Sequence, residues 1–123
     1  KNYSKLLESF KKYDDLFVLP SQLDFVETAM LAFPFVVKET APFTRRQMQI
    51  YLEKHDIQTR TIFTGNILRQ SGFKNIERRD SSGGYPNSDQ VMTGGMLIGC
   101  HQGMTHTEIA YVIDCIHSFV TLF

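Results

Sequence analysis

The side chains best suited to bind an anionic ligand lie in one short segment, residues 59–70. A β-rich run there ends in Gly65-Asn66 and passes directly into a short helical piece. Ligand-binding groups gather at strand ends, and a helix N-terminus offers free backbone N–H groups to an anion. Arg60 and Arg69 would add bidentate contacts to a phosphate or carboxylate, and Asn66 can bind a sugar hydroxyl. In the alternative interpretation, Arg60 pairs with a nearby carboxylate and Asn66 only supplies a left-handed turn.

A second candidate segment, residues 99–105, joins a buried strand to the last helix. His101 would lie at the end of that strand, where a site can form, although an ordinary strand-to-helix turn is the favoured interpretation of the segment. His101 and His106 lie near Cys100, but no fourth ligand follows at a recognised spacing, so we expect no metal site. Cys100 and Cys115 are expected to be small buried hydrophobic residues. Standard nucleotide-binding and hydrolase motifs are absent from the sequence.

Charge is unevenly distributed along the chain, although 13 basic and 13 acidic residues give a formal net charge of zero. Residues 41–79 carry eight Lys or Arg against three acidic residues, a net charge of +5. An anionic ligand would bind this third of the chain. The alternative is that these basic side chains only form a solvated surface without a ligand. We expect this for the arginines outside the 59–70 segment: Arg45, Arg46, Arg78 and Arg79. Zero net charge argues against a nucleic-acid-binding protein.

Composition indicates one folded domain spanning residues 1–123, with 42% hydrophobic and 12% aromatic residues. No apolar stretch approaches the roughly 20 residues of a membrane span. Two cysteines suit a reducing cytosol, and no leader peptide is visible, so we expect a cytoplasmic protein without membrane contact.

Hydrophobic periodicity predicts alternating helices and short strands. Helices are expected from the spacing of apolar residues and from two capping boxes, Thr44 with Gln47 and Thr105 with Glu108. The expected helices are 3–13, 44–55, 67–70, 89–92 and 105–119, and the expected strands are 16–19, 33–38, 57–63 and 96–100. Pro34 suggests an edge or strand-start position. The pattern predicts an α/β (α+β) domain with helices packed on a small sheet.

Two segments carry a family resemblance. The segment "IQTRTIFTGNILRQSGF" resembles the TR…F-x-GN-x-x-RQ string of the nucleotide-sugar 3-dehydrases (3-dehydratases). The segment "PNSDQVMTGGMLIGCHQGMTHTEIAYVIDCI" resembles their PN-x-D…GCH-x-G-x-T string. These enzymes are a branch of the DegT/StrS family of fold-type I pyridoxal-phosphate enzymes, and the resemblance covers roughly residues 33–121.

The resemblance implies that the chain is the small C-terminal domain of a longer enzyme, with a mostly antiparallel sheet. A large N-terminal domain outside this chain would bind pyridoxal or pyridoxamine phosphate and supply the catalytic base, so the isolated domain would be inactive. The substrate would be a CDP- or GDP-linked 4-keto-6-deoxyhexose, used in deoxysugar and lipopolysaccharide synthesis. The full-length enzyme would be a homodimer. Some relatives carry an iron–sulfur cluster in the other domain, and this chain does not decide that question.

Matching the motifs residue by residue, the resemblance implies that five side chains face substrate or cofactor: Arg60, Phe63, Asn66, Arg69 and His101. Arg69 would contact the nucleotide phosphates or hold the loop. Ser71 replaces the usual Pro of the RQP string, so the following turn should be less rigid. Two alternatives remain: an aminotransferase of the same family, and a stand-alone anion-binding interaction domain.

Overall fold

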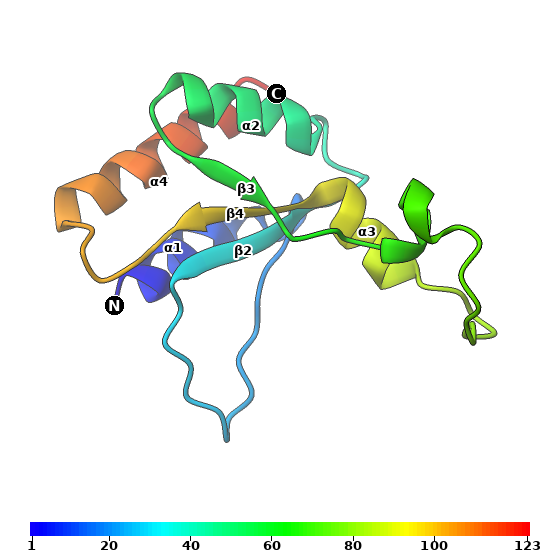
Figure 1. Cartoon of the computed structure of the whole chain (residues 1–123). Coiled ribbons are helices and arrows are strands. Elements are labelled where there is room, and N and C mark those ends of the chain that lie inside the picture. Colours follow the sequence, from blue (N-terminus) through cyan, green and yellow to red (C-terminus); the bar gives the residue numbers. More distant parts are fainter.

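Helices and strands alternate through residues 1–123, all of which the computed structural model describes (Figure 1). The bounds are α1 (Asn2–Phe10), the 3-10 turn η1 (Lys11–Tyr13), β1 (Phe17–Val18), β2 (Ala32–Val37), α2 (Arg45–Lys54), β3 (Thr59–Thr61), the 3-10 turns η2 (Ile67–Arg69) and η3 (Ser71–Phe73), α3 (Pro86–Gly94), β4 (Gly95–Gly99) and α4 (His106–Val120). No helix here combines the length and apolar character that a bilayer crossing requires.

The four strands form one antiparallel sheet in the order β1-β2-β4-β3, which confirms the predicted fold class. Two rows of side chains cross it, one on each face, because neighbouring residues of a strand point to opposite sides. Phe33, Ile98 and Thr59 form one row, and all three are buried. Pro34, Leu97 and Arg60 form the other row, on the opposite face.

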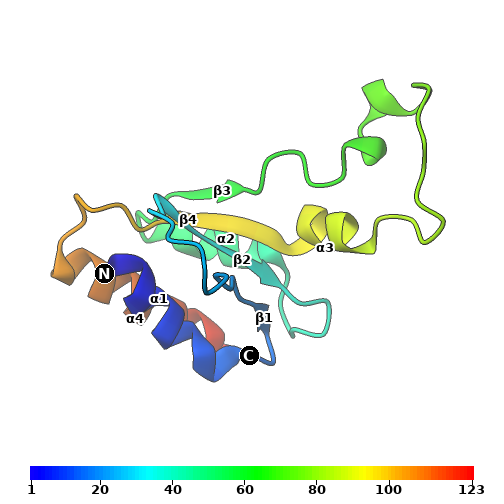
Figure 2. The ribbon, with the colours of Figure 1, turned by 90° about the horizontal axis from the view of Figure 1, so that it is seen from below.

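Helices cover only one face of the sheet. Figure 2 shows α1 and α4 together on one side of the strands, and the side opposite them carries no helix layer. The core lies under the helices, where the Phe10 ring packs 5.1 Å from Phe17, 5.1 Å from Phe33 and 4.8 Å from Phe35, measured between ring centroids. The row containing Arg60 therefore faces away from the core.

Both predicted capping boxes are present. The Thr44 hydroxyl accepts a hydrogen bond from the Gln47 N–H and starts α2, and Thr105 does the same with Glu108 at the start of α4. In each box the fourth residue's side chain bonds back to the cap N–H, so two otherwise unpaired donors are satisfied at each helix start.

Three predictions about local structure need correction. The strand predicted at 57–63 is limited to Thr59–Thr61, because the chain turns at Phe63 with φ of +44°. The helix predicted at 89–92 is longer, since Pro86 occupies its first turn, where proline is well tolerated. Pro34 lies in β2 between two strands, but β1 pairs only with Val36 and Val37. At Pro34 itself, β2 has one neighbour, so the missing N–H costs no ladder hydrogen bond.

Arg45 was predicted to be a solvated surface residue, and this is wrong. Its guanidinium is partly buried, and Nη1 donates to the carbonyl oxygens of Met92 and Gly95, each at 3.2 Å. These carbonyls lie at the C-terminal end of α3, where a positive charge is favourable. The side chain of Arg45 thus joins α2 to the junction between α3 and β4.

Residues 62–85 form an arm that leaves the sheet between β3 and α3. Figure 2 shows this arm rising on the side away from α1 and α4. It holds η2 and η3, and all side chains from Ser71 to Gly84 are exposed. The arm therefore extends beyond the uncovered face of the sheet.

Candidate functional site

Arg60 projects from β3 on the uncovered face and forms no hydrogen bond or ion pair. The carboxylate of Glu53 lies near Arg60 but has another partner, because its Oε1 accepts from the Thr59 N–H at 2.6 Å and from the Thr59 hydroxyl at 2.7 Å. These two bonds, more than the nearby charge of Arg60, hold the pKa of Glu53 below its ordinary value. Arg60 therefore does not pair with a carboxylate, as the alternative interpretation of the sequence expected. Its guanidinium is available to an anion.

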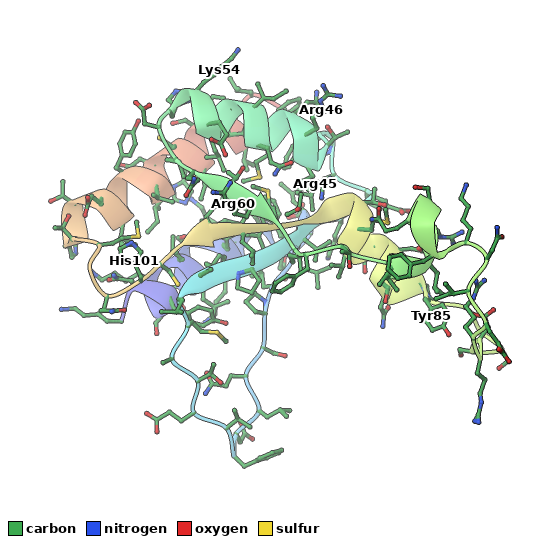
Figure 3. All side chains as sticks on the ribbon, in the orientation of Figure 1. Arg45, Arg46, Lys54, Arg60, Tyr85 and His101 are labelled. Atoms are coloured by element: carbon green, nitrogen blue, oxygen red, sulfur yellow. The ribbon has the colours of Figure 1, made fainter.

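A shallow basic groove lies between β3 and α2, with Arg60 on one wall. The groove has a volume of about 680 Å³ and is lined by Arg46, Gln49, Ile50, Glu53, Lys54, Thr59, Arg60 and Thr61. Arg46 and Lys54 come from α2, and Arg60 comes from β3 (Figure 3). Three cations against one carboxylate make this groove attractive to an anion.

Phe63 is 91% exposed although its side chain is large and apolar. Its φ of +44° is rare for a residue with a bulky side chain. A tight turn holds this geometry: the Phe63 N–H donates to Thr61 at 3.0 Å, and the Gly65 N–H donates to Ile62 at 3.1 Å. Strained backbone together with an exposed aromatic ring marks a candidate contact site for another molecular surface.

Asn66 is 5% exposed, and its amide is already occupied. Nδ2 donates to Oδ1 of Asp89 at 2.7 Å, and Oδ1 accepts from the Leu68 N–H at 3.0 Å. With φ of −94°, Asn66 does not adopt the left-handed conformation that we considered for it. Phe63 and Gly65 carry the positive φ values instead.

Arg69 binds the same carboxylate through two of its three guanidinium nitrogens. Nε lies 2.9 Å from Oδ1 of Asp89, and Nη2 lies 2.7 Å from Oδ2. The hydrogen bonds from Arg69, followed by the bond from Asn66, lower the pKa of Asp89 from 3.8 to about 2. Of the two roles considered for Arg69, this geometry favours holding the loop.

Sequence reasoning missed Asp89 as a member of the site. The residue was part of the PN-x-D string that carried the family resemblance, but nothing in the spacing linked it to Arg69, which precedes it by twenty positions. The structure brings Asp89 next to Asn66 and Arg69, because α3 returns the chain to the base of the arm.

His101 lies apart from the other four candidate residues. It follows β4, whereas the arm begins at the far end of the sheet, and Figure 3 shows His101 distant from Tyr85 at the end of the arm. The His101 Nδ1 accepts from the Gly103 N–H at 3.2 Å, an arrangement that suits a strand-to-helix turn. Neighbouring Cys100 is 3% exposed, and burial raises the pKa of its thiol, as expected for a cysteine that serves as a small hydrophobic residue.

Comparison with known proteins places the chain in a family. Residues 1–117 match the model of the DegT/DnrJ/EryC1/StrS aminotransferase family. The chain is 29% identical over 121 residues to the lipopolysaccharide biosynthesis protein RfbH of Salmonella typhimurium, covering 98% of this chain and 28% of that protein. It is 30% identical over 120 residues to the dTDP-4-dehydro-2,6-dideoxy-D-glucose 3-dehydratase of Saccharopolyspora spinosa, covering 98% of this chain and 26% of that protein.

A solved structure agrees with these sequence matches. The Escherichia coli GDP-4-keto-6-deoxy-D-mannose-3-dehydratase, with bound hydrated PLP, superposes with a TM-score of 0.75 at 26% identity, covering 93% of this chain and 28% of that chain. The chain thus spans little more than a quarter of the length of these relatives. Sequence match and fold agree, and the chain belongs to the DegT/DnrJ/EryC1/StrS aminotransferase family.

Proposed function

We propose that this chain is the small C-terminal domain of a longer, PLP- or PMP-dependent nucleotide-sugar 3-dehydratase. In this proposal the uncovered sheet face and the arm close over a site whose cofactor is held by a large domain. The observation that carries the proposal is an unpaired Arg60 in β3 together with an exposed, strained Phe63 two residues after that strand ends. Two relatives described as 3-dehydratases support this branch of the family.

The chemistry of these side chains fits a nucleotide sugar. Arg60 offers a planar set of donors suited to phosphate oxygens, and the Phe63 ring offers an apolar surface to the face of a sugar. When bound, the cofactor would supply the electron sink that allows a proton to be removed beside a keto carbon. Arg60 would bind and orient the substrate, and Phe63 would help to exclude water. The chain would not complete the reaction alone.

The direct test uses the full-length protein and a nucleotide-linked 4-keto-6-deoxyhexose. We expect cofactor absorbance and loss of the C3 hydroxyl from the sugar. We expect Arg60→Ala to lower kcat/KM about 100-fold, because a charged contact in a closed site is lost. Arg79→Ala is the matched control, since the side chain of Arg79 is an exposed cation of the same basic third and makes no hydrogen bond. Absence of cofactor binding and of dehydration would overturn the proposal.

An aminotransferase of the same family would give a different product. It would transfer an amino group from glutamate to the keto sugar, and its cofactor-linking residue would be Lys, where a dehydratase of this branch is expected to have His. Product analysis and the identity of that residue therefore separate the two activities within one experiment.

A second candidate function rests on the basic groove between α2 and β3. Its three cations would suit a stand-alone domain that binds an anion without a large domain. Calorimetry on the chain of residues 1–123 with GDP-sugar tests this possibility. Tight binding that is lost in Arg46→Ala would favour the interaction domain, whereas no binding by the chain alone would exclude it.

A further inference from the structure

One carboxylate fastens the arm to the rest of the molecule. Asp89 receives three hydrogen bonds from two arm residues, one from Asn66 and two from Arg69. We propose that Asp89 is a positioning residue: it clamps the base of the arm so that Phe63 is held toward the ligand site, beyond the end of the strand that carries Arg60. This inference rests on the proposed function for its consequence in catalysis, but the clamp itself is tested without any activity.

The clamp joins the arm to a firmly packed element. Asp89 lies in the first turn of α3, where the helix dipole favours a negative charge. At its other end α3 packs against the sheet, since Gly94 lies against the backbone of Val37. A fork of two parallel bonds from Arg69 to one carboxylate defines both distance and direction. Asp89 thus holds the arm in a fixed place relative to the sheet.

No other side chain fastens the arm through hydrogen bonds. Among residues 64–85, the remaining side-chain hydrogen bonds stay within the arm, as between Gln70 and Thr64 or between Arg78 and Asp80. The three bonds to Asp89 are the side-chain hydrogen bonds that connect these residues to the rest of the chain. Removal of the carboxylate would leave the segment after Phe63 attached through backbone and apolar contacts alone.

The location of the clamp explains why it would matter for Phe63. The ring stands between β3, which ends at Thr61, and Asn66, whose buried amide is bound to Asp89. An exposed aromatic ring with positive φ has no packing of its own to hold it. Its direction is therefore determined by the two ends of this short turn, one in the sheet and the other in the clamp.

The first test measures amide hydrogen exchange at Leu68, whose N–H donates to the side chain of Asn66. The chain of residues 1–123 contains its own core of 18 buried residues, and circular dichroism confirms folding of each variant. We expect exchange to rise about tenfold in Asp89→Asn, because local opening becomes easier when the ion pair is lost. Asp80→Asn removes the other Arg–Asp pair of the arm and should leave Leu68 unchanged.

A second variant keeps this test decisive if Asp89→Asn fails to fold. Arg69→Gln removes the same ion pair from a side chain that is 64% exposed, so the core is untouched. It should raise the exchange of Leu68 to a similar degree. Unchanged exchange in either folded variant would overturn the clamp.

The catalytic consequence is measured in the full-length enzyme with GDP-linked 4-keto-6-deoxyhexose. We expect Asp89→Asn to raise KM about tenfold with a smaller change in kcat, because substrate contacts are misplaced while the cofactor site is intact. Cofactor absorbance and thermal midpoint should equal those of Asp80→Asn. Wild-type KM in Asp89→Asn would refute the positioning role. A wild-type enzyme without turnover would instead refute the proposed function, and the exchange result would still stand.

Discussion

The helix-covered core and the arm are held by different forces. In the core, Phe10 touches three other phenylalanine rings and is fully buried, so burial of apolar surface stabilises it. In the arm, the large apolar side chain of Phe63 is 91% exposed, and one carboxylate, Asp89, supplies the anchor. The core is held by apolar packing, whereas the side-chain hydrogen bonds that fasten the arm all end on one carboxylate.

Because of this difference, the stability of the whole chain and the position of the arm should respond to different substitutions. Substitutions in the core should change the free energy of unfolding of the whole chain. Substitutions at the clamp should change local opening of the arm and leave global unfolding nearly unchanged. Regions that contact ligands are commonly drawn from the less stable part of a fold, and the arm has that character.

The largest contrast is expected from the same substitution in the two regions. Phe10→Ala should lower the free energy of unfolding by about 3–5 kcal/mol, because it leaves a cavity among three rings. Phe63→Ala should change it by less than about 0.5 kcal/mol, since the ring makes little contact with the chain. Urea unfolding of both variants measures the difference. Similar losses at the two positions would mean that Phe63 packs against the core after all.

Two glycines test how closely the arm contacts α3. Gly65 and Gly84 have φ of +61° and +66°, so alanine is strained at both positions. A Cβ on Gly65 would also collide with Met92, whereas a Cβ on Gly84 would meet nothing within 4 Å. Urea unfolding should therefore show a loss of about 1–2 kcal/mol for Gly84→Ala, and a further 1–3 kcal/mol for Gly65→Ala. Equal losses would show that the contact between Gly65 and Met92 is not a tight one.

A smaller effect is expected at the helix caps of the core. Thr105→Ala removes the side chain that accepts the Glu108 N–H and should cost about 1 kcal/mol of global stability. Thr105→Ser keeps the hydroxyl and is the matched control. If amide exchange at Leu68 also rose in Thr105→Ala, by more than the global loss explains, the core and the arm would not be independent.

Sequence patterns predicted the core better than the arm for a physical reason. Periodicity and capping boxes are local, so α2, α4 and the strand positions followed from residues near one another in the chain. The clamp is not local, because Asp89 meets Asn66 and Arg69 only after η3 and a long exposed stretch have turned the chain back. The motif named Arg60 and Phe63 as candidates to face a ligand, which stays a prediction, whereas the contacts of Asn66 required the fold. The hydrogen bonds from Arg45 to the end of α3 could not be predicted either, because they also join residues far apart in the sequence.

The smallest effect is expected from the pH dependence of amide exchange, which distinguishes protonation of the clamp from the loss of global stability in acid. The pKa of Asp89 is lowered from 3.8 to about 2 by Arg69 and Asn66, so the clamp is complete above pH 3.8 and is lost as the pH falls toward 2. Glu108, exposed in the first turn of α4, also has a lowered pKa through its bonds to Thr105, and its protonation lowers global stability in acid. Both wild type and Asp89→Asn lose this global stability. Comparing their Leu68 exchange rates at each pH therefore removes it. We expect the difference between the two rates to be constant near neutral pH and to shrink between pH 3.8 and about 2. A difference that persisted at pH 2 would show that the carboxylate charge does not hold the arm.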